Sequence, residues 1–177
     1  MQPRVLGTLL LGCSLLLGGV AHAQAAHPAF VTELSGAEEV PSRATLTRGV
    51  ADVLVSQDGT SVYYTLTATD ASTPIMAAHI HIAAKGENGP VVVTLCSAQT
   101  QPCATEGTVA QGTFTSADLA GPLQGGALSD LIDQMQSGNA YVNYHTAKFP
   151  DGEGRGQLVD LASMASGQPG AAAALAD

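Results

Sequence analysis

Tryptophan is absent from this 177-residue sequence, and aromatic residues make up only 4% of it. A hydrophobic core must therefore consist mainly of Val, Leu, Ile and Ala side chains. Basic residues are also scarce, with 6 Lys and Arg against 15 Asp and Glu, so the formal net charge is −9. This balance argues against binding to nucleic acids or to anionic membranes. A P-loop, a dinucleotide fingerprint and a nucleophile triad are missing too, and the length suits one domain.

The N-terminal segment has the three parts of an export signal. A short basic region that ends at Arg4 precedes an apolar run over residues 5–20, and Ala21–Ala23 provides a small-x-small cleavage site. We therefore expect residues 1–23 to be a signal peptide, and the mature chain to start near Gln24 and to be periplasmic or secreted. The alternative is a lipoprotein processed at Cys13, but the apolar run continues past this cysteine.

Cysteine is rare as well, and removal of the signal peptide leaves only Cys96 and Cys103. In an oxidising compartment, two cysteines seven positions apart on either side of a short polar stretch predict one loop disulfide. The alternative is a redox-active or metal-binding pair, although the C-x-x-C spacing of such pairs is missing.

Strand-like patterns fill most of the chain after the export signal, and we expect residues 24–161 to form one domain. Runs rich in Val, Thr and Ile are separated by turn residues, and Gln57–Thr60 predicts a hairpin turn between two of them. Ser129–Ser137 is the single segment with helical spacing, and Ser129 is its expected N-cap. These features predict an all-β fold, an antiparallel β-sandwich or barrel with one short helix. The Ala/Gly-rich tail, residues 162–177, should be disordered.

Three histidines fall on the polar faces of predicted strands. In Ala78–Ile82, apolar residues alternate with His79 and His81, which therefore share one face about 7 Å apart. In Tyr141–His145, the first, third and fifth residues point away from the core, and the fifth is His145. Imidazole is the commonest ligand of Zn(II) and Cu(II), and three imidazoles leave an open coordination position. If the two strands are neighbours, the three histidines form a copper or zinc site; if not, they are ordinary surface histidines.

Three further segments carry conspicuous polar residues. Lys85–Pro90 has the Gly and Asn residues of a structural loop. Arg155 begins a later strand and either pairs with Glu153 or Asp151 or reaches over the histidine face, where it is a candidate for guiding an anion. The adjacent acids Glu38–Glu39 should lie in a surface turn, because neighbouring residues of a strand point to opposite faces and do not form a catalytic pair.

These stretches resemble the CHRD (chordin) domain family over about residues 28–161. Three motifs occur in the family's order: L-S-G-A-E-E-V-P at 34–41, then A-H-I-H at 78–81 with G-E-N-G-P-V-V-V at 86–93, and A-Y-V-N-Y-H-T at 140–146 with F-P-D-G-E-G-R-G-Q-L at 149–158. The resemblance implies an immunoglobulin-like β architecture in exported or extracellular proteins, without a known activity. The sequence departs from the family pattern at Ile82 and Ala83, where Gly-Pro is frequent, and at Gly154, where an aliphatic residue is usual.

The histidine pattern also resembles the copper half of the Cu/Zn superoxide dismutase family. By this resemblance His79, His81 and His145 correspond to copper ligands, and Arg155 corresponds to the anion-guiding arginine. The bridging histidine, the zinc loop and the cysteine positions of that family are missing. We therefore predict an exported, non-enzymatic domain with a binding or structural role toward an unknown extracytoplasmic partner or a metal ion. A copper-dependent oxidoreductase of superoxide-dismutase type is the alternative.

Overall fold

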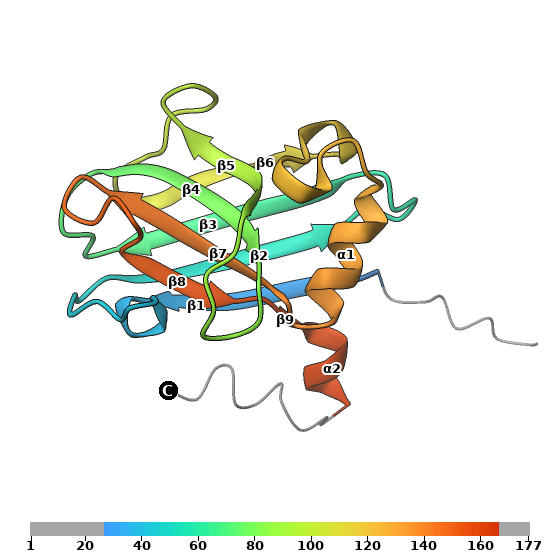
Figure 1. The fold of residues 1–177 in the computed structure, drawn as a ribbon, viewed down its shortest axis with the longest axis horizontal. Coiled ribbons are helices and arrows are strands. Elements are labelled where there is room, and N and C mark those ends of the chain that lie inside the picture. The colour runs from blue at the N-terminus through green and yellow to red at the C-terminus, as the bar shows by residue number, and fades with distance from the viewer. Residues whose placement is uncertain (1–26, 167–177) are drawn as a thin grey trace, which may run out of the picture.

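Within residues 27–166, nine antiparallel strands form one sheet that curls into a nearly closed barrel (Figure 1). The computed structural model describes these residues, so the predicted signal peptide and residues 167–177 lie outside the described part. The all-β antiparallel architecture predicted from the sequence is confirmed. The strands are β1 (Ala29–Ser35), β2 (Arg48–Val55), β3 (Val62–Thr69), β4 (Ile75–Ile82), β5 (Val91–Ser97), β6 (Gly107–Phe114), β7 (Ala140–Thr146), β8 (Gly154–Gln157) and β9 (Val159–Asp160).

Strict alternation of side chains determines which face of β2 and β3 points into the barrel. Every second residue of both strands is buried, as period-two patterning requires. The turn between them is closed by Asp58, whose Oδ1 accepts hydrogen bonds from the Ser56 hydroxyl (2.7 Å) and the Thr60 backbone N–H (3.1 Å). Gly59 adopts the left-handed backbone conformation that this turn needs. The predicted hairpin turn is confirmed.

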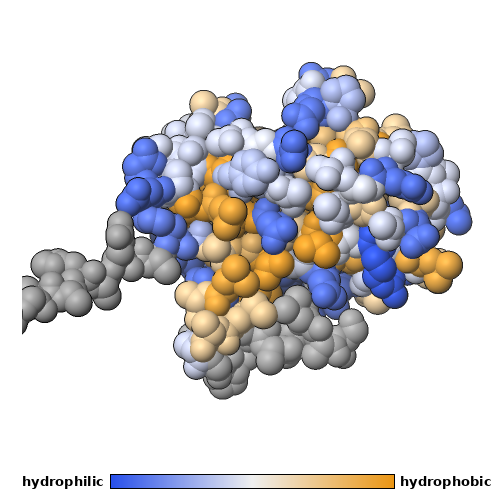
Figure 2. All heavy atoms as spheres, turned by 180° about the vertical axis from the view of Figure 1, so that it is seen from behind, coloured by the Kyte–Doolittle hydropathy of each residue, from blue (hydrophilic) through white to orange (hydrophobic). Residues whose placement is uncertain are grey.

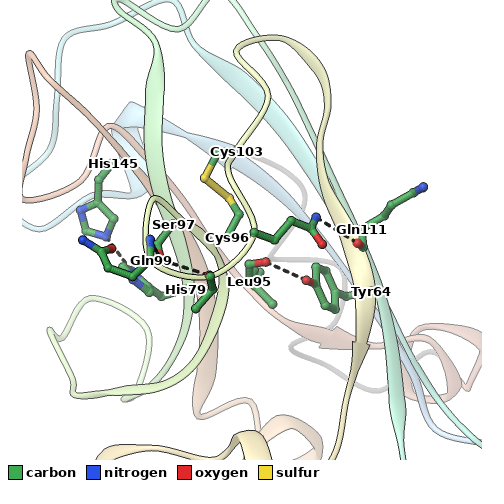
Figure 3. Close-up of a disulfide and its surroundings, with 11 residues drawn as sticks. Tyr64, His79, Leu95, Cys96, Ser97, Gln99, Cys103, Gln111 and His145 are labelled. Atoms are coloured by element: carbon green, nitrogen blue, oxygen red, sulfur yellow. Dashed lines mark hydrogen bonds between the residues drawn. A yellow bond between two sulfur atoms is a disulfide. The ribbon is translucent and has the colours of Figure 1, made fainter.

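The strand order is β5-β4-β7-β8-β1-β2-β3-β6, so β5 and β6 are the two edges that approach each other. Tyr64 of β3 donates a hydrogen bond to the Leu95 carbonyl of β5 at 2.7 Å. At the end of β5, Cys96 forms a disulfide with Cys103 in the segment that leads to β6, with 5.2 Å between their Cα atoms (Figure 3). The structure thus contains the predicted disulfide, and the bridge fastens the connection that spans the two edges.

Two short α-helices accompany the barrel. The first, α1 (Leu128–Gln136), lies where a helix was expected, but its N-cap is Ala127 and not Ser129. The reason is Asp130, whose carboxylate accepts a hydrogen bond from the Ala127 N–H at 3.1 Å and so fixes an earlier start. The second, α2 (Leu161–Ala165), occupies the beginning of the segment expected to lack regular structure.

A few large apolar side chains stay outside the core. The face opposite to the view of Figure 1 shows apolar residues between hydrophilic ones (Figure 2). Among the described residues, no helix combines the length and the apolar character needed to cross a membrane. The exposed large apolar residues of this part are Leu46, Val50, Leu54, Tyr63, Met76 and Leu161.

Candidate metal centre

Pairing of β4 with β7 brings the three histidines together. The register places His79 opposite Asn143, His81 opposite Tyr141, and Ala77 opposite His145. Alternate residues of both strands enter the core, so the histidines lie on the outer face, as strand parity predicted. One ring nitrogen from each of His79, His81 and His145 lies within 4.8 Å of the other two.

Backbone carbonyls orient two of the three rings. Nδ1 of His81 lies 2.9 Å from the Gly89 carbonyl oxygen, and Nδ1 of His145 lies 2.9 Å from that of Pro150. A carbonyl only accepts hydrogen bonds, so both Nδ1 atoms carry the proton and both Nε2 atoms present a lone pair. This outer hydrogen bond is the usual companion of a metal-ligating imidazole.

The third ring faces one of these lone pairs. Nδ1 of His79 lies 3.1 Å from Nε2 of His145, so in the metal-free protein His79 is the donor and carries its proton on Nδ1 (Figure 3). A metal held through Nδ1 of His79 would require this proton to move to Nε2 of the same ring.

The histidine face is covered at His81, while His79 and His145 are half-buried, so this face is not the exposed sheet face that was expected. His81 is only 8% exposed, and its neighbours Tyr141 and Asn143 are 3% and 4% exposed. Segments 39–43 and 85–90 fold over these strands, and the Asn88 amide joins them by a hydrogen bond to the Val40 carbonyl (2.8 Å). Strand alternation indicates where a side chain points but not whether a loop covers it.

Burial makes the three imidazoles neutral at pH 7. Loss of solvent, together with His145 and His81 nearby, lowers the pKa of His79 to about 4. Burial also lowers the pKa of His81 and of His145, against the opposing effect of the hydrogen bonds to Gly89 and Pro150. Metal ions bind neutral imidazole. Burial therefore keeps the three histidine rings in the protonation state that metal binding requires.

Arg155 lies behind the histidines rather than over them. Its guanidinium is 3.5 Å from the centre of the Tyr141 ring, and His81 stacks on that ring at 4.8 Å. Since β4 and β8 flank β7, the arginine and the histidine contact opposite faces of the tyrosine. The guanidinium donates to Asn88 Oδ1 (3.1 Å) and to the Glu87 carbonyl (2.5 Å), so the 85–90 loop, expected to be structural, holds Arg155 in place.

Glu39 is the functional candidate that sequence reasoning missed. It was expected in a surface turn, but it follows the short 3-10 helix η1 (Gly36–Glu38) and is only 6% exposed. Burial raises its pKa to about 7, although the charges of Arg155 and Arg43 act in the opposite direction. The alternation of side chains that separates inward from outward residues in a strand does not apply to a turn. The sequence therefore gives no signal that Glu39 is buried and the adjacent Glu38 is not.

A pocket of about 390 Å³ lies between Glu39 and the histidines. Its volume is in the range of small-molecule sites. Because His81 and His145 form part of its wall, a ligand in the pocket can reach these two histidines. Its lining includes Glu39, Arg43, His81, Asn143, His145 and Asp151.

The family model of the CHRD domain matches residues 30–158. The chain belongs to the CHRD domain family. The match lies inside the predicted domain, residues 24–161, and includes the histidine strands and the disulfide. No curated protein and no solved structure was found to match the chain.

The CHRD domain has a second route to the cluster. His79 and His145 line a more apolar pocket of about 330 Å³ together with Met76 and the loop that carries Ser97 and Gln99 (Figure 3). This loop is the one that the disulfide closes. The bridge, which is compatible with an oxidising extracytoplasmic compartment, thus also shapes a wall next to two of the histidines.

Glu153 is a buried carboxylate with a structural role in this domain. Burial alone would raise its pKa, but several hydrogen bonds outweigh that effect and hold the pKa below its ordinary value. It is fully buried and ties two loops to β7. Its partners are the hydroxyl of Thr45 (2.7 Å), the N–H (2.9 Å) and hydroxyl (2.5 Å) of Ser72, and the hydroxyl of Thr146 (2.7 Å).

Proposed function

We propose that this CHRD domain binds one transition-metal ion through His79, His81 and His145, and that its role is binding rather than catalysis. The observation that carries the proposal is the convergence of three neutral imidazoles, two of which are oriented by carbonyls so that Nε2 carries the lone pair. Nε2 of His81 is buried and has no partner among the described residues. A buried lone pair without a donor is costly, and a metal ion satisfies it.

The spacing of the nitrogens fits a single ion. Ligands at about 2.0–2.1 Å from one metal are at most about 4.2 Å apart, so the widest separation in the cluster has to shrink by roughly half an ångström. The 3.1 Å between His79 and His145 suits adjacent ligands without any movement. Three neutral nitrogens favour Cu(II) over Zn(II), by the general order of affinities.

Metal analysis and calorimetric titration test this proposal. Protein prepared without chelators should carry close to one equivalent of copper or zinc, and the metal-free protein should bind Cu(II) at one site. His81→Ala and His145→Ala should each weaken this site by more than about a hundredfold, since even the outer hydrogen-bond partners of metal ligands account for 10–100-fold. The matched control is His27→Ala, because His27 is exposed and lies outside the cluster. Equal Cu(II) affinity for His81→Ala and the parent contradicts the site.

We infer that the domain works outside the cytoplasm, in the periplasm or as a secreted protein. The support is the N-terminal pattern of residues 1–23 together with the disulfide. Intact mass spectrometry of the exported protein should find a chain that starts near Gln24. A diacylated N-terminal Cys13 would contradict the start near Gln24, and an uncleaved chain in the cytoplasm would contradict the inferred location.

A copper-dependent oxidoreductase of superoxide-dismutase type is the second candidate. The pocket of about 390 Å³ favours it, because it lets a small anion reach the side of the cluster formed by His81 and His145. Decay of superoxide in the presence of copper-loaded protein measures this activity. Acceleration that is lost in His81→Ala supports the enzyme, and a rate no higher than that of the metal-free protein excludes it.

A further inference from the structure

The pocket beside the histidines collects every buried side-chain polar atom that has no hydrogen-bond partner among residues 27–166. These atoms are Oε1 of Glu39, Nε of Arg43, Nε2 of His81 and Oδ1 of Asn143, and all four residues line the same pocket. More than about 90% of buried backbone polar groups, and most buried side-chain polar atoms, have a hydrogen-bond partner in protein or ordered water. Four such atoms around one pocket make it a candidate site for a ligand that supplies their partners.

The atoms define what that ligand must offer. With Nε2 of His81 directed to the metal, two acceptors remain, Oε1 of Glu39 and Oδ1 of Asn143, and one donor, the Nε–H of Arg43. Asn143 lies in the same row of the sheet as His79, so its amide is next to the metal ligands. A ligand that matches both kinds of group must carry a hydrogen for at least one acceptor and a lone pair for the arginine.

The carboxylate of Glu39 is held by its surroundings. At Gly152, whose φ is +124°, a side chain would come within 2.5 Å of Oε1 of Glu39, so the backbone of this glycine packs directly against the carboxylate. Glu39 is almost completely buried, and the guanidinium groups of Arg155 and Arg43 place opposite charges near it. A rigid acceptor of this kind selects between ligands by hydrogen bonding rather than by charge alone.

We propose, on the basis of the metal site inferred above, that this pocket takes a small oxyanion that carries a hydrogen, such as hydrogencarbonate, as an additional ligand of the metal. One anionic oxygen binds the metal, the O–H donates to Glu39, and a further oxygen accepts from the Nε–H of Arg43. A divalent ion together with Arg43 and the nearby Arg155 outweighs the negative charges of Glu39 and Asp151, so an anion is favoured. Azide has no hydrogen to donate. Its negative charge would therefore lie near the Glu39 carboxylate without a hydrogen bond to offset the repulsion.

The test compares the two anions on the copper-loaded protein. With protein in excess over Cu(II), hydrogencarbonate and azide are titrated separately, and the Cu(II) absorption and electron paramagnetic resonance spectra report occupancy of the open position. Glu39→Ala should lower the affinity for hydrogencarbonate at least about tenfold, the effect of losing a hydrogen bond to a charged group, and leave the azide affinity unchanged or raised. The matched control is Glu38→Ala, because Glu38 is the neighbouring acid and pairs with Lys85 at 3.5 Å outside the pocket.

The possible outcomes distinguish a failure of the pocket proposal from a failure of the metal-site proposal. If the parent does not bind Cu(II) at one site, the proposed function fails, and the pocket proposal fails with it. If Cu(II) binds but hydrogencarbonate leaves its spectra unchanged, or if Glu39→Ala weakens both anions equally, only the pocket proposal is overturned. Glu39→Gln, which keeps the shape and a weaker acceptor, should give a smaller loss for hydrogencarbonate and provides the same comparison if Glu39→Ala does not fold.

Discussion

Replacing Glu39 by Gln should stabilise the metal-free protein in alkaline solution. Burial raises the pKa of this carboxyl from its ordinary value of 4.5 to about 7. A pKa raised by folding costs about 1.4 kcal/mol per unit once the group is ionised in both states, so the penalty above pH 7 is at most about 3.5 kcal/mol. The penalty is absent below pH 4.5, where folded and unfolded chains are both protonated, and it grows as the pH rises toward 7. Glutamine has nearly the same shape and stays neutral throughout.

Urea unfolding near pH 8 and near pH 5 measures the effect on the parent, on Glu39→Gln and on the control Glu38→Gln. We expect Glu39→Gln to raise the free energy of unfolding by about 2–3 kcal/mol at the higher pH and by about 1 kcal/mol or less at the lower one. The control should stay within about 0.5 kcal/mol, because its ion pair with Lys85 is at the surface. A Glu39→Gln protein less stable than the parent near pH 8, or equally stabilised at both pH values, would refute the reasoning.

Four further predictions follow from the fold and the cluster. Replacing Cys96 and Cys103 by Ser should lower the free energy of unfolding by about 2–3 kcal/mol, and thiol labelling of the denatured, unreduced parent should find no free thiol in the mature chain. Glu153→Gln should destabilise the protein near neutral pH, and the difference from the parent in urea unfolding should shrink in acid, because a carboxylate with a lowered pKa loses its contribution as it is protonated. His81→Ala should cost the metal-free protein about 1–2 kcal/mol, since the ring is buried against an aromatic neighbour; a loss under about 0.5 kcal/mol would speak against that packing. Nitrogen-15 NMR should find the proton of His79 on Nδ1 in the metal-free protein and on Nε2 with Zn(II), and an unchanged tautomer would contradict coordination through Nδ1.

Local patterns were sufficient for the parts of the site that depend on one strand or one turn. The alternation in β4 and β7 predicts on which side His79, His81 and His145 lie, because neighbouring side chains of a strand must point to opposite faces. The turn at Gln57–Thr60 is likewise a matter of a few adjacent residues. The pairing of β4 with β7 joins segments that are more than fifty residues apart in the sequence. A local pattern cannot predict such a contact.

The path of the covering loops could not be predicted, and the errors concentrate there. Glu39 was assigned to a surface turn because nothing in its neighbours reports that segment 39–43 folds back over the sheet. Arg155 was expected either to pair with an acid close in sequence or to reach over the histidine face, whereas it is held by Glu87 and Asn88 from a distant loop. Both cases depend on long-range packing, which outweighs local preference.

The position of β1 in the sheet has a consequence for how the chain folds. One edge of β1 pairs with β2, which follows closely in sequence, but the other pairs with β8 and β9, where Phe30 lies opposite Asp160. The barrel therefore remains open until almost the whole domain is available, and a growing chain that lacks residues 154–160 presents an unpaired strand in its middle. Such an edge invites pairing with another chain, so a fragment ending before β8 should aggregate rather than fold, and closure of the barrel should be a late and slow event.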